Sequence, residues 1–188
     1  MEIKYLKNKL FRLRGKKGMV LFRPTGSLDL GGFKKGIVVG GDEFLANEEV
    51  LFVGGSGEYE RDGIEVLGVE CGGGVVVYIV DIDGINVCYF EGIKELLSEK
   101  EINKIADLDA DVLLFSLADE PSKNSRKVLE WARKWGISYL VPMGYENDDG
   151  VLAGFLDAVD MEGKQKEECL KIGSRMELPD GMEVVVLE

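Results

Sequence analysis

Carboxylate side chains follow two short apolar segments of the chain, where a binding site could form. Asp42 and Glu43 come shortly after Ile37-Val38-Val39, and Glu91 directly follows the apolar run 85–90. If both segments are strands that end at one edge, the three carboxylates could converge there. Carboxylate oxygens are the ligands that hard cations such as Mg²⁺ and Ca²⁺ prefer. The alternative is that these residues are solvated carboxylates on an acidic surface.

Histidine is absent from all 188 residues. It is the usual acid–base group near neutral pH and the commonest metal ligand. Its absence excludes Ser-His-Asp and Cys-His catalysis and every zinc site that depends on imidazole. The three cysteines, Cys71, Cys88 and Cys169, are widely separated and form no Cys-x-x-Cys pair. This argues against a disulfide framework and a zinc ribbon, and we interpret them as buried small hydrophobic residues.

Two glycine-containing stretches resemble ligand loops in composition only. Gly54-Gly55-Ser56-Gly57 leads into an acidic stretch and lacks the lysine of a phosphate-binding loop. Glu58 stands where a nucleophile elbow needs its last glycine. Asp81-Ile82-Asp83-Gly84 starts like a calcium loop, but its glycine comes too early. We interpret the first stretch as glycines chosen for backbone conformation and the second as a hairpin turn.

The formal charge of −12 is unevenly distributed along the chain. Residues 1–36 hold ten Lys and Arg against two acidic residues, a net of +8, and residues 37–188 hold thirteen against thirty-three, a net of −20. The basic segment either neutralises the acidic remainder or forms a local patch for an anionic partner. So acidic a body argues against nucleic acid as the main partner.

Length and composition predict a single globular domain spanning residues 1–188. The chain is 45% hydrophobic and 31% charged, and its length suffices to bury most of its apolar surface. No apolar run approaches the ~20 residues that span a bilayer, and the segment 1–5 has no signal-peptide core. We expect a cytoplasmic protein with no membrane partner.

The hydrophobic pattern predicts strands first and a strand–helix–strand unit later. The stretch Val50–Val69 is typical of a strand, a tight loop with a charged turn, and a second strand. Two β-branched runs flank the Asp83-Gly84 turn, which is a hairpin signal, and Ser98 with Glu101 forms a capping box. From Val112 to Val141 the pattern gives a buried strand, a helix over 122–135 and another strand, which is a βαβ unit.

Three of these stretches, in this order, resemble the metallo-β-lactamase fold superfamily, and among its members the small single-domain hydrolases related to ascorbate-phosphate lactonases. They are Gly57-Glu58-Tyr59-Glu60 with the strand after it, the Asp83-Gly84 hairpin, and the segment 111–145. The resemblance covers nearly the whole chain. It implies an α/β protein with a four-layer αββα sandwich.

The same resemblance implies that the metal centre of the family has been lost. The window that carries His-x-His-x-Asp-His in the family contains Asp42 and Glu43 here, and Gly144 stands where a further ligand histidine would be. Tyr89 stands at another histidine position, with the carboxylate displaced onto Glu91. We therefore expect no cofactor, no metal ligand and no catalytic residue. The candidate remnant cleft consists of Asp42, Glu43, Glu91 and Tyr145.

Three functions remain open on this basis. The first is a non-catalytic binding or assembly module for an unknown protein or small molecule, with a cleft filled by Phe44, Tyr89 or Tyr145. The second is a metal-dependent hydrolase with a rebuilt carboxylate site, which acts on a small anionic substrate. The third is a homo-oligomer with an apolar surface patch that includes Trp131, although ordinary packing is the interpretation we favour for this side chain.

Overall fold

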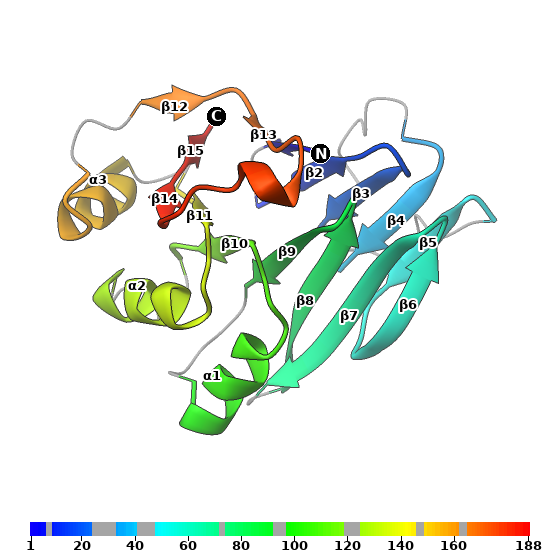
Figure 1. Ribbon diagram of the computed structural model, residues 1–188, viewed down its shortest axis with the longest axis horizontal. Helices are drawn as coiled ribbons and strands as arrows, with labels where there is room; N and C mark the ends of the chain where they lie inside the picture. Colours follow the sequence, from blue (N-terminus) through cyan, green and yellow to red (C-terminus); the bar gives the residue numbers. More distant parts are fainter. Residues whose placement is uncertain are drawn as a thin grey trace.

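The structure is a computed structural model that describes residues 1–6, 9–23, 33–40, 48–71, 74–91, 97–118, 125–145, 149–161 and 165–188. Two β-sheets pack face to face, and helices cover one of them (Figure 1). This arrangement confirms the predicted α/β class. The two sheets share a continuous hydrophobic core.

The first sheet begins with the basic N-terminal strands. It has six strands in the order β13-β1-β2-β3-β4-β5, with the bounds β1 Glu2–Tyr5, β2 Phe11–Arg14, β3 Met19–Phe22, β4 Gly36–Val39, β5 Val50–Val53 and β13 Leu170–Lys171. Strands β1, β2 and β3 are antiparallel, whereas β4 pairs in parallel with both β3 and β5. The carboxyl ends of β3, β4 and β5 therefore lie at one edge.

The second sheet contains the predicted βαβ unit. Its seven strands run in the order β14-β11-β10-β9-β8-β7-β6, with the bounds β6 Gly57–Arg61, β7 Ile64–Cys71, β8 Val75–Ile82, β9 Ile85–Phe90, β10 Val112–Ser116, β11 Tyr139–Met143 and β14 Glu183–Val184. Strands β9, β10 and β11 are parallel, so their carboxyl ends also share an edge. Two short strands, β12 (Lys166–Glu167) and β15 (Val186–Leu187), pair separately.

Two Asp-Gly turns connect the antiparallel strands of this sheet. Asp83 and Gly84 have φ of 59° and 78°, and Asp62 and Gly63 have φ of 53° and 76°. Positive φ at both central residues is the type I′ geometry that suits the twist of a hairpin. The first turn was predicted. The loop expected across 57–61 is wrong, because that segment is the edge strand β6, whose polar side chains face solvent and hide its strand character.

The glycine cluster after β5 carries the chain from one sheet to the other. A Cβ atom at Gly68 in β7 would lie only 2.4 Å from the carbonyl oxygen of Gly55. The crossing segment and β7 can approach this closely only because position 68 has no side chain. Within the cluster itself, Gly57 has φ of 137°, a backbone conformation that favours glycine, in agreement with the interpretation that this glycine serves the backbone.

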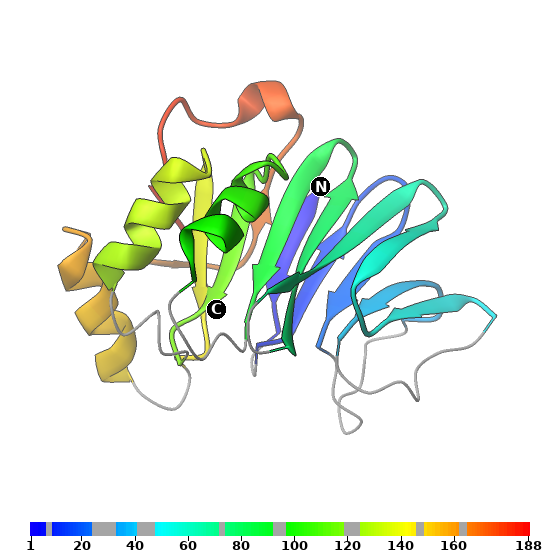
Figure 2. The ribbon, with the colours of Figure 1, turned by 90° about the horizontal axis from the view of Figure 1, so that it is seen from below.

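Helices α1 (Glu99–Ala106), α2 (Ser125–Lys134) and α3 (Asp149–Ala158) cover part of the outer face of the seven-stranded sheet and leave its β6 edge open (Figure 2). Helix α1 begins at the predicted capping box, in which Ser98 and Glu101 satisfy each other's backbone N–H groups. None of the described helices is long and apolar enough to cross a membrane. The described part thus shows three of the four expected layers: one helical layer and two sheets.

Aromatic contacts fix these helices to the sheet. Phe90 and Phe115 are neighbours in register on one face. The ring centroid of Phe90 lies 6.2 Å from that of Trp131 and 6.0 Å from that of Trp135, and Phe115 lies 5.3 Å from Phe155. Both tryptophans are buried. Ordinary packing of Trp131 is therefore confirmed, and the alternative of a surface patch at this residue is wrong, because its side chain anchors α2.

Other side chains of the core follow the sequence interpretation in part. Cys71 and Cys88 are buried as predicted, whereas Cys169 is partly exposed. A second, smaller apolar cluster lies on the outer face of the six-stranded sheet and contains Leu10, Leu21, Val38 and Val50.

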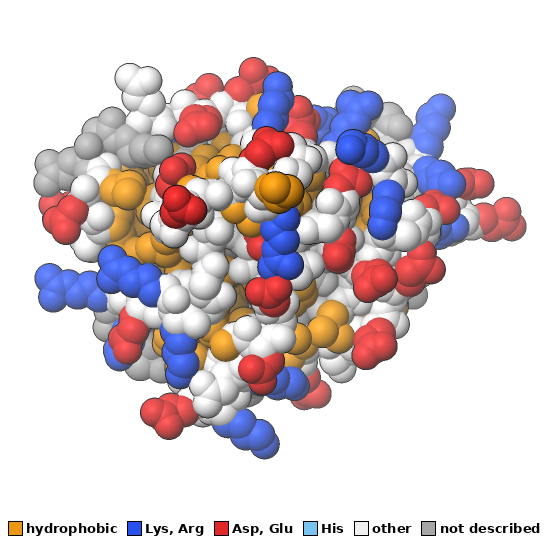
Figure 3. Space-filling view, viewed as in Figure 1, with side chains coloured by type: hydrophobic (Ala, Val, Ile, Leu, Met, Phe, Trp, Pro, Cys, Tyr) orange, Lys and Arg blue, Asp and Glu red, His pale blue; other side chains and the backbone are white. Residues whose placement is uncertain are grey.

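Charged side chains of both signs mix over the surface, and Lys and Arg stand directly beside Asp and Glu on the face shown in Figure 3. Several cations of the basic N-terminal segment pair with the acidic remainder. Lys4 contacts Glu168 at 2.8 Å and Lys35 contacts Asp62 at 3.1 Å. These pairs favour the interpretation that the basic strands neutralise the acidic body.

Candidate functional site

Glu91, directly after β9, is a buried carboxylate held by three protein groups. Its side chain is only 7% exposed. The Lys9 ammonium lies 2.9 Å from Oε1, and the Arg23 Nε lies 3.2 Å from Oε2. The Tyr89 hydroxyl donates to Oε2 at 2.9 Å. The carboxylate that the sequence suggested as a metal ligand is therefore the partner of two protein cations.

The backbone at both cations is strained. Lys9, in the turn before β2, has φ of 64°, and Arg23, directly after β3, has φ of 49°. For a non-glycine residue, this left-handed conformation costs about 1–2 kcal/mol of conformational energy, although Asn and Asp tolerate it. The other described non-glycine residues with positive φ are all aspartates. Backbone strain of this kind clusters at functional sites. Here it occurs at the two residues whose side chains reach Glu91.

Tyr89 lies beside both the carboxylate and the backbone of Lys9. Its ring stacks on Phe22 with centroids 4.5 Å apart and planes 6° from parallel. Its hydroxyl lies within hydrogen-bond distance of Glu91 Oε2 and of the Lys9 carbonyl oxygen, at 3.1 Å. A phenol has one proton to donate, so these two acceptors share it. Stacking fixes the ring that links Lys9 to Glu91.

The side chain of Lys9 passes over Gly144, at the carboxyl end of β11. A Cβ atom at position 144 would lie 3.3 Å from Lys9 Cε and 3.4 Å from Ser116 Oγ. The Gly144 N–H donates to the Tyr5 hydroxyl at 3.1 Å, and its φ is 76°. A side chain at this position would therefore compete with Lys9 for the same space.

Arg23, Tyr89 and Glu91 border a cavity at the carboxyl ends of β3, β4 and β9. The cavity, which we call the Glu91 cavity, has a volume of about 510 Å³. It is lined by Arg23, Gly40, Phe52, Gly54, Gly74, Val75, Val76, Tyr78, Tyr89 and Glu91. Ligands of α/β proteins commonly bind at the carboxyl ends of strands. The Arg23 side chain is 52% exposed and so remains accessible to a ligand.

The described residues do not fit a metal ion at this position. Within them, no group of three or more His, Cys, Asp or Glu side chains could hold one. A divalent cation at Glu91 would also meet the ammonium of Lys9 and the guanidinium of Arg23 at contact distance. Like charges so close to a buried group repel strongly.

Known structures share this architecture over the whole chain. A proposed zinc-dependent hydrolase of the metallo-β-lactamase superfamily from Thermotoga maritima superposes with a TM-score of 0.76 and 19% identity, and the match covers 100% of this chain and 98% of that one. The chain has the metallo-β-lactamase fold. No protein-family model and no curated protein matches the sequence.

Two further structures extend the likeness. A metallo-hydrolase from the archaeon Ignicoccus hospitalis has a TM-score of 0.62 at 15% identity, over 91% of this chain and 98% of its own. A proposed metal-dependent hydrolase from Parabacteroides distasonis has a TM-score of 0.62 at 16% identity, over 99% and 93%. At these identities the likeness establishes the metallo-β-lactamase fold and leaves the activity open.

The four predicted cleft residues have separate outcomes. Glu91 lies in the cavity, whereas Asp42 and Glu43 lie outside the described residues. Tyr145 is turned away from the cavity: its hydroxyl donates to the carbonyl oxygen of Leu187 in β15. Burial, with a smaller contribution from Glu188, raises the pKa of Tyr145 to about 12.

Sequence reasoning missed the two cations of the site. The sequence analysis counted Lys9 and Arg23 only among the cations of the basic segment 1–36. One local signal was present, since Arg23 directly follows an apolar strand and precedes Pro24, just as the carboxylates follow theirs. Tyr89 was expected to fill the cleft, and it lines the cavity.

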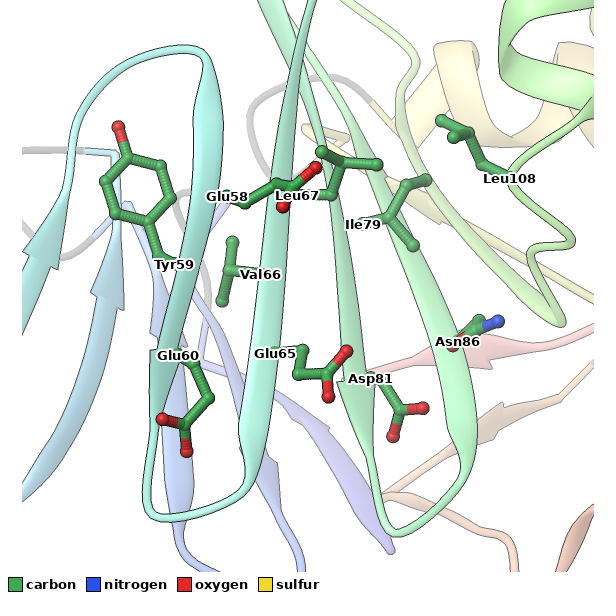
Figure 4. Close-up of a pocket in the computed structure, with 10 residues that line it drawn as sticks. All are labelled: Glu58, Tyr59, Glu60, Glu65, Val66, Leu67, Ile79, Asp81, Asn86 and Leu108. Atoms are coloured by element: carbon green, nitrogen blue, oxygen red, sulfur yellow. The ribbon is translucent and has the colours of Figure 1, made fainter.

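A second cavity of about 610 Å³ lies on the outer face of the strands β6–β9 (Figure 4). Glu60, Glu65 and Asp81 occupy directly opposite positions on three neighbouring strands, and Asn86 extends this row. The Gly63 and Gly84 backbone N–H groups donate to Glu60 and Asp81. These carboxylates stand on an open sheet face, so we place the candidate site at Glu91, where charge is buried and paired.

Proposed function

We propose that the chain is a non-catalytic binding module, in which protein cations have replaced the metal centre of a metallo-β-lactamase fold. The observation that carries this proposal is the pairing of the buried Glu91 carboxylate with Lys9 and Arg23. Two positive charges stand beside the carboxylate that the family resemblance matches to the bridging metal ligand. The charge of a metal ion is thereby supplied by the chain itself.

This replacement preserves attraction for anions without the chemistry of a metal. A bound metal lowers the pKa of a water molecule and so generates a nucleophile. Ammonium and guanidinium groups only donate hydrogen bonds and cannot activate water in this way. The chain also has no histidine to serve as a general base. Arg23, which lines the cavity, can hold a ligand there, but neither cation supplies a group that activates water.

A second candidate is a metal-dependent hydrolase with a rebuilt carboxylate site. The descriptions of the three similar structures, each a known or proposed hydrolase, favour it. It requires that Glu91 exchange its two protein cations for a metal ion, with Asp42 and Glu43 as further ligands.

Metal content and thermal stability separate the two candidates. The protein is purified without chelator or affinity-tag metal, its metal content is measured, and its melting temperature is recorded with and without EDTA. We expect no stoichiometric metal and an unchanged melting temperature. Stoichiometric metal that is lost in Glu91→Gln, with a melting temperature that falls on chelation, would refute the binding-module proposal.

The same module could serve a protein partner or a second copy of the chain. Size-exclusion chromatography with mass measurement tests the homo-oligomer directly. A monomer at micromolar concentration leaves the cavity as the place to look for a ligand.

A further inference from the structure

We propose that the Glu91 cavity binds a small organic anion, whose carboxylate or phosphate group contacts Arg23 and whose apolar body lies against Tyr78 and Phe52. This inference rests on the proposed function, because it requires that protein cations and not a metal ion provide the positive charge.

The cavity carries a surplus of positive charge. Lys9 and Arg23 share the single carboxylate of Glu91. Within the part of the chain that the structure describes, no other carboxylate pairs with either cation. Among these described groups, one positive charge is therefore uncompensated at a partly buried position. A charge removed from water without a partner is costly, and an anionic ligand relieves that cost.

Arg23 has the geometry to receive such a group. Its Nε contacts Glu91, and no other described residue pairs with the four N–H donors of its two terminal nitrogens, on a side chain that is 52% exposed. The planar fork of a guanidinium matches a carboxylate or phosphate with two parallel hydrogen bonds. Its backbone N–H donates to the carbonyl oxygen of Val39 at 2.8 Å, so this residue is fixed at the cavity edge despite its strained φ.

The side chains that line the Glu91 cavity indicate what kind of body the anionic ligand has. Tyr78 and Tyr89 are opposite each other in register on β8 and β9, and Phe52 contributes a half-buried ring from β5. Burial raises the pKa of Tyr78, so its hydroxyl stays a neutral donor at physiological pH. A volume of about 510 Å³ lies within the range of small-molecule sites, which combine apolar walls with a few polar groups. Such walls favour an anion with an aromatic or aliphatic body over a bare inorganic ion.

Titration calorimetry with simple probes tests this assignment. Benzoate and phenyl phosphate represent the two anionic groups, benzyl alcohol is the neutral analogue, and inorganic phosphate is the anion without a body. Each is titrated up to about 10 mM into protein whose metal content has been measured. We expect at least one of the two aromatic anions to bind, at least about tenfold tighter than benzyl alcohol and inorganic phosphate. Tighter binding of benzoate identifies a carboxylate as the preferred anionic group, and tighter binding of phenyl phosphate identifies a phosphate.

Two substitutions locate the binding site. Arg23→Gln should weaken the aromatic anion at least about tenfold, as expected for the loss of a charge-assisted pair. Arg14→Gln removes an exposed cation from the same basic segment outside the cavity, and it should change the affinity by less than about twofold. Equal effects of the two substitutions would overturn the assignment. So would binding of neither aromatic anion, or binding of inorganic phosphate as tight as that of phenyl phosphate. Metal-free protein that binds no anion defeats this inference alone, whereas stoichiometric metal defeats the proposed function.

Discussion

Replacing Lys9 by Met tests whether the buried Glu91 carboxylate depends on protein cations. Met keeps an unbranched apolar stem and the same left-handed backbone penalty, so the main change is the loss of the ammonium. Removing one partner of a fully buried ion pair costs about 3–5 kcal/mol. Arg23 remains 3.2 Å from the carboxylate, and the Lys9 side chain is 29% exposed. We therefore expect Lys9→Met to lower the free energy of unfolding by about 2 kcal/mol, in line with hydrogen bonds to charged groups.

Urea unfolding followed by circular dichroism measures this loss, which corresponds to a fall of about 4–8 °C in melting temperature for a chain of this size. Lys4→Met is a matched control. Lys4 contacts Glu168 at 2.8 Å, and its side chain is 28% exposed, but Glu168 is 78% exposed where Glu91 is 7% exposed. The control should show little or no loss, because exposed pairs contribute little. Equal losses in the two variants would refute the argument that burial of Glu91 makes its cations important.

Four further substitutions test other features of the chain. Gly144→Ala should cost about 1–2 kcal/mol in urea unfolding, since its φ of 76° disfavours any side chain and the new Cβ atom crowds Lys9. Glu65→Gln should raise stability by up to about 1 kcal/mol at low salt and less at high salt, because Glu65 stands between two other carboxylates in its cross-strand row. Burial raises the pKa of Tyr145 to about 12 from 10.0, so its contribution to stability is present below pH 10 and is lost as the pH rises through 12. Tyr145→Phe should abolish that alkaline loss and cost about 1 kcal/mol at neutral pH. Burial also raises the pKa of Asp111, whereas a backbone hydrogen bond from Asn86 and the charge of Arg175 oppose this shift. Arg175→Met should therefore destabilise the protein by about 1–2 kcal/mol at pH 7, and by less as the pH falls through the raised pKa of Asp111 and this carboxyl takes up a proton.

Local structure was predictable wherever neighbouring residues alone decide it. The Asp83-Gly84 turn, the capping box at Ser98 and the βαβ unit that ends at β11 are all confirmed. Each depends on contacts within a few residues or on a hydrophobic period. The strand β6 was missed because an edge strand can form without an apolar face of its own. Its residues Gly57–Arg61 are mostly polar and exposed, so they show no alternation of apolar and polar side chains.

Trp131 shows why the charge of sequence neighbours does not decide the face of a helix on which a side chain lies. Its neighbours Arg133 and Lys134 are charged, which left an exposed position open beside ordinary packing. In the structure its ring stacks near Trp135 with centroids 6.1 Å apart, and both rings reach Phe90. Two large aromatic side chains one turn apart widen the buried stripe of the helix beyond what its small residues indicate.

The sequence by itself determined that no imidazole chemistry is available, because composition settles that without any fold. It also determined the order of strands that resembles the metallo-β-lactamase fold. Only the tertiary structure decided which groups surround the Glu91 carboxylate. Arg23 and Glu91 follow β3 and β9, whereas Lys9 lies in the turn before β2, and no local pattern links the three residues. Lys9 reaches the edge of Arg23 because β2 runs antiparallel to β3, with Phe11 opposite Phe22. The two packed sheets bring this edge to the carboxyl end of β9, so the partner of a buried carboxylate is a property of the fold.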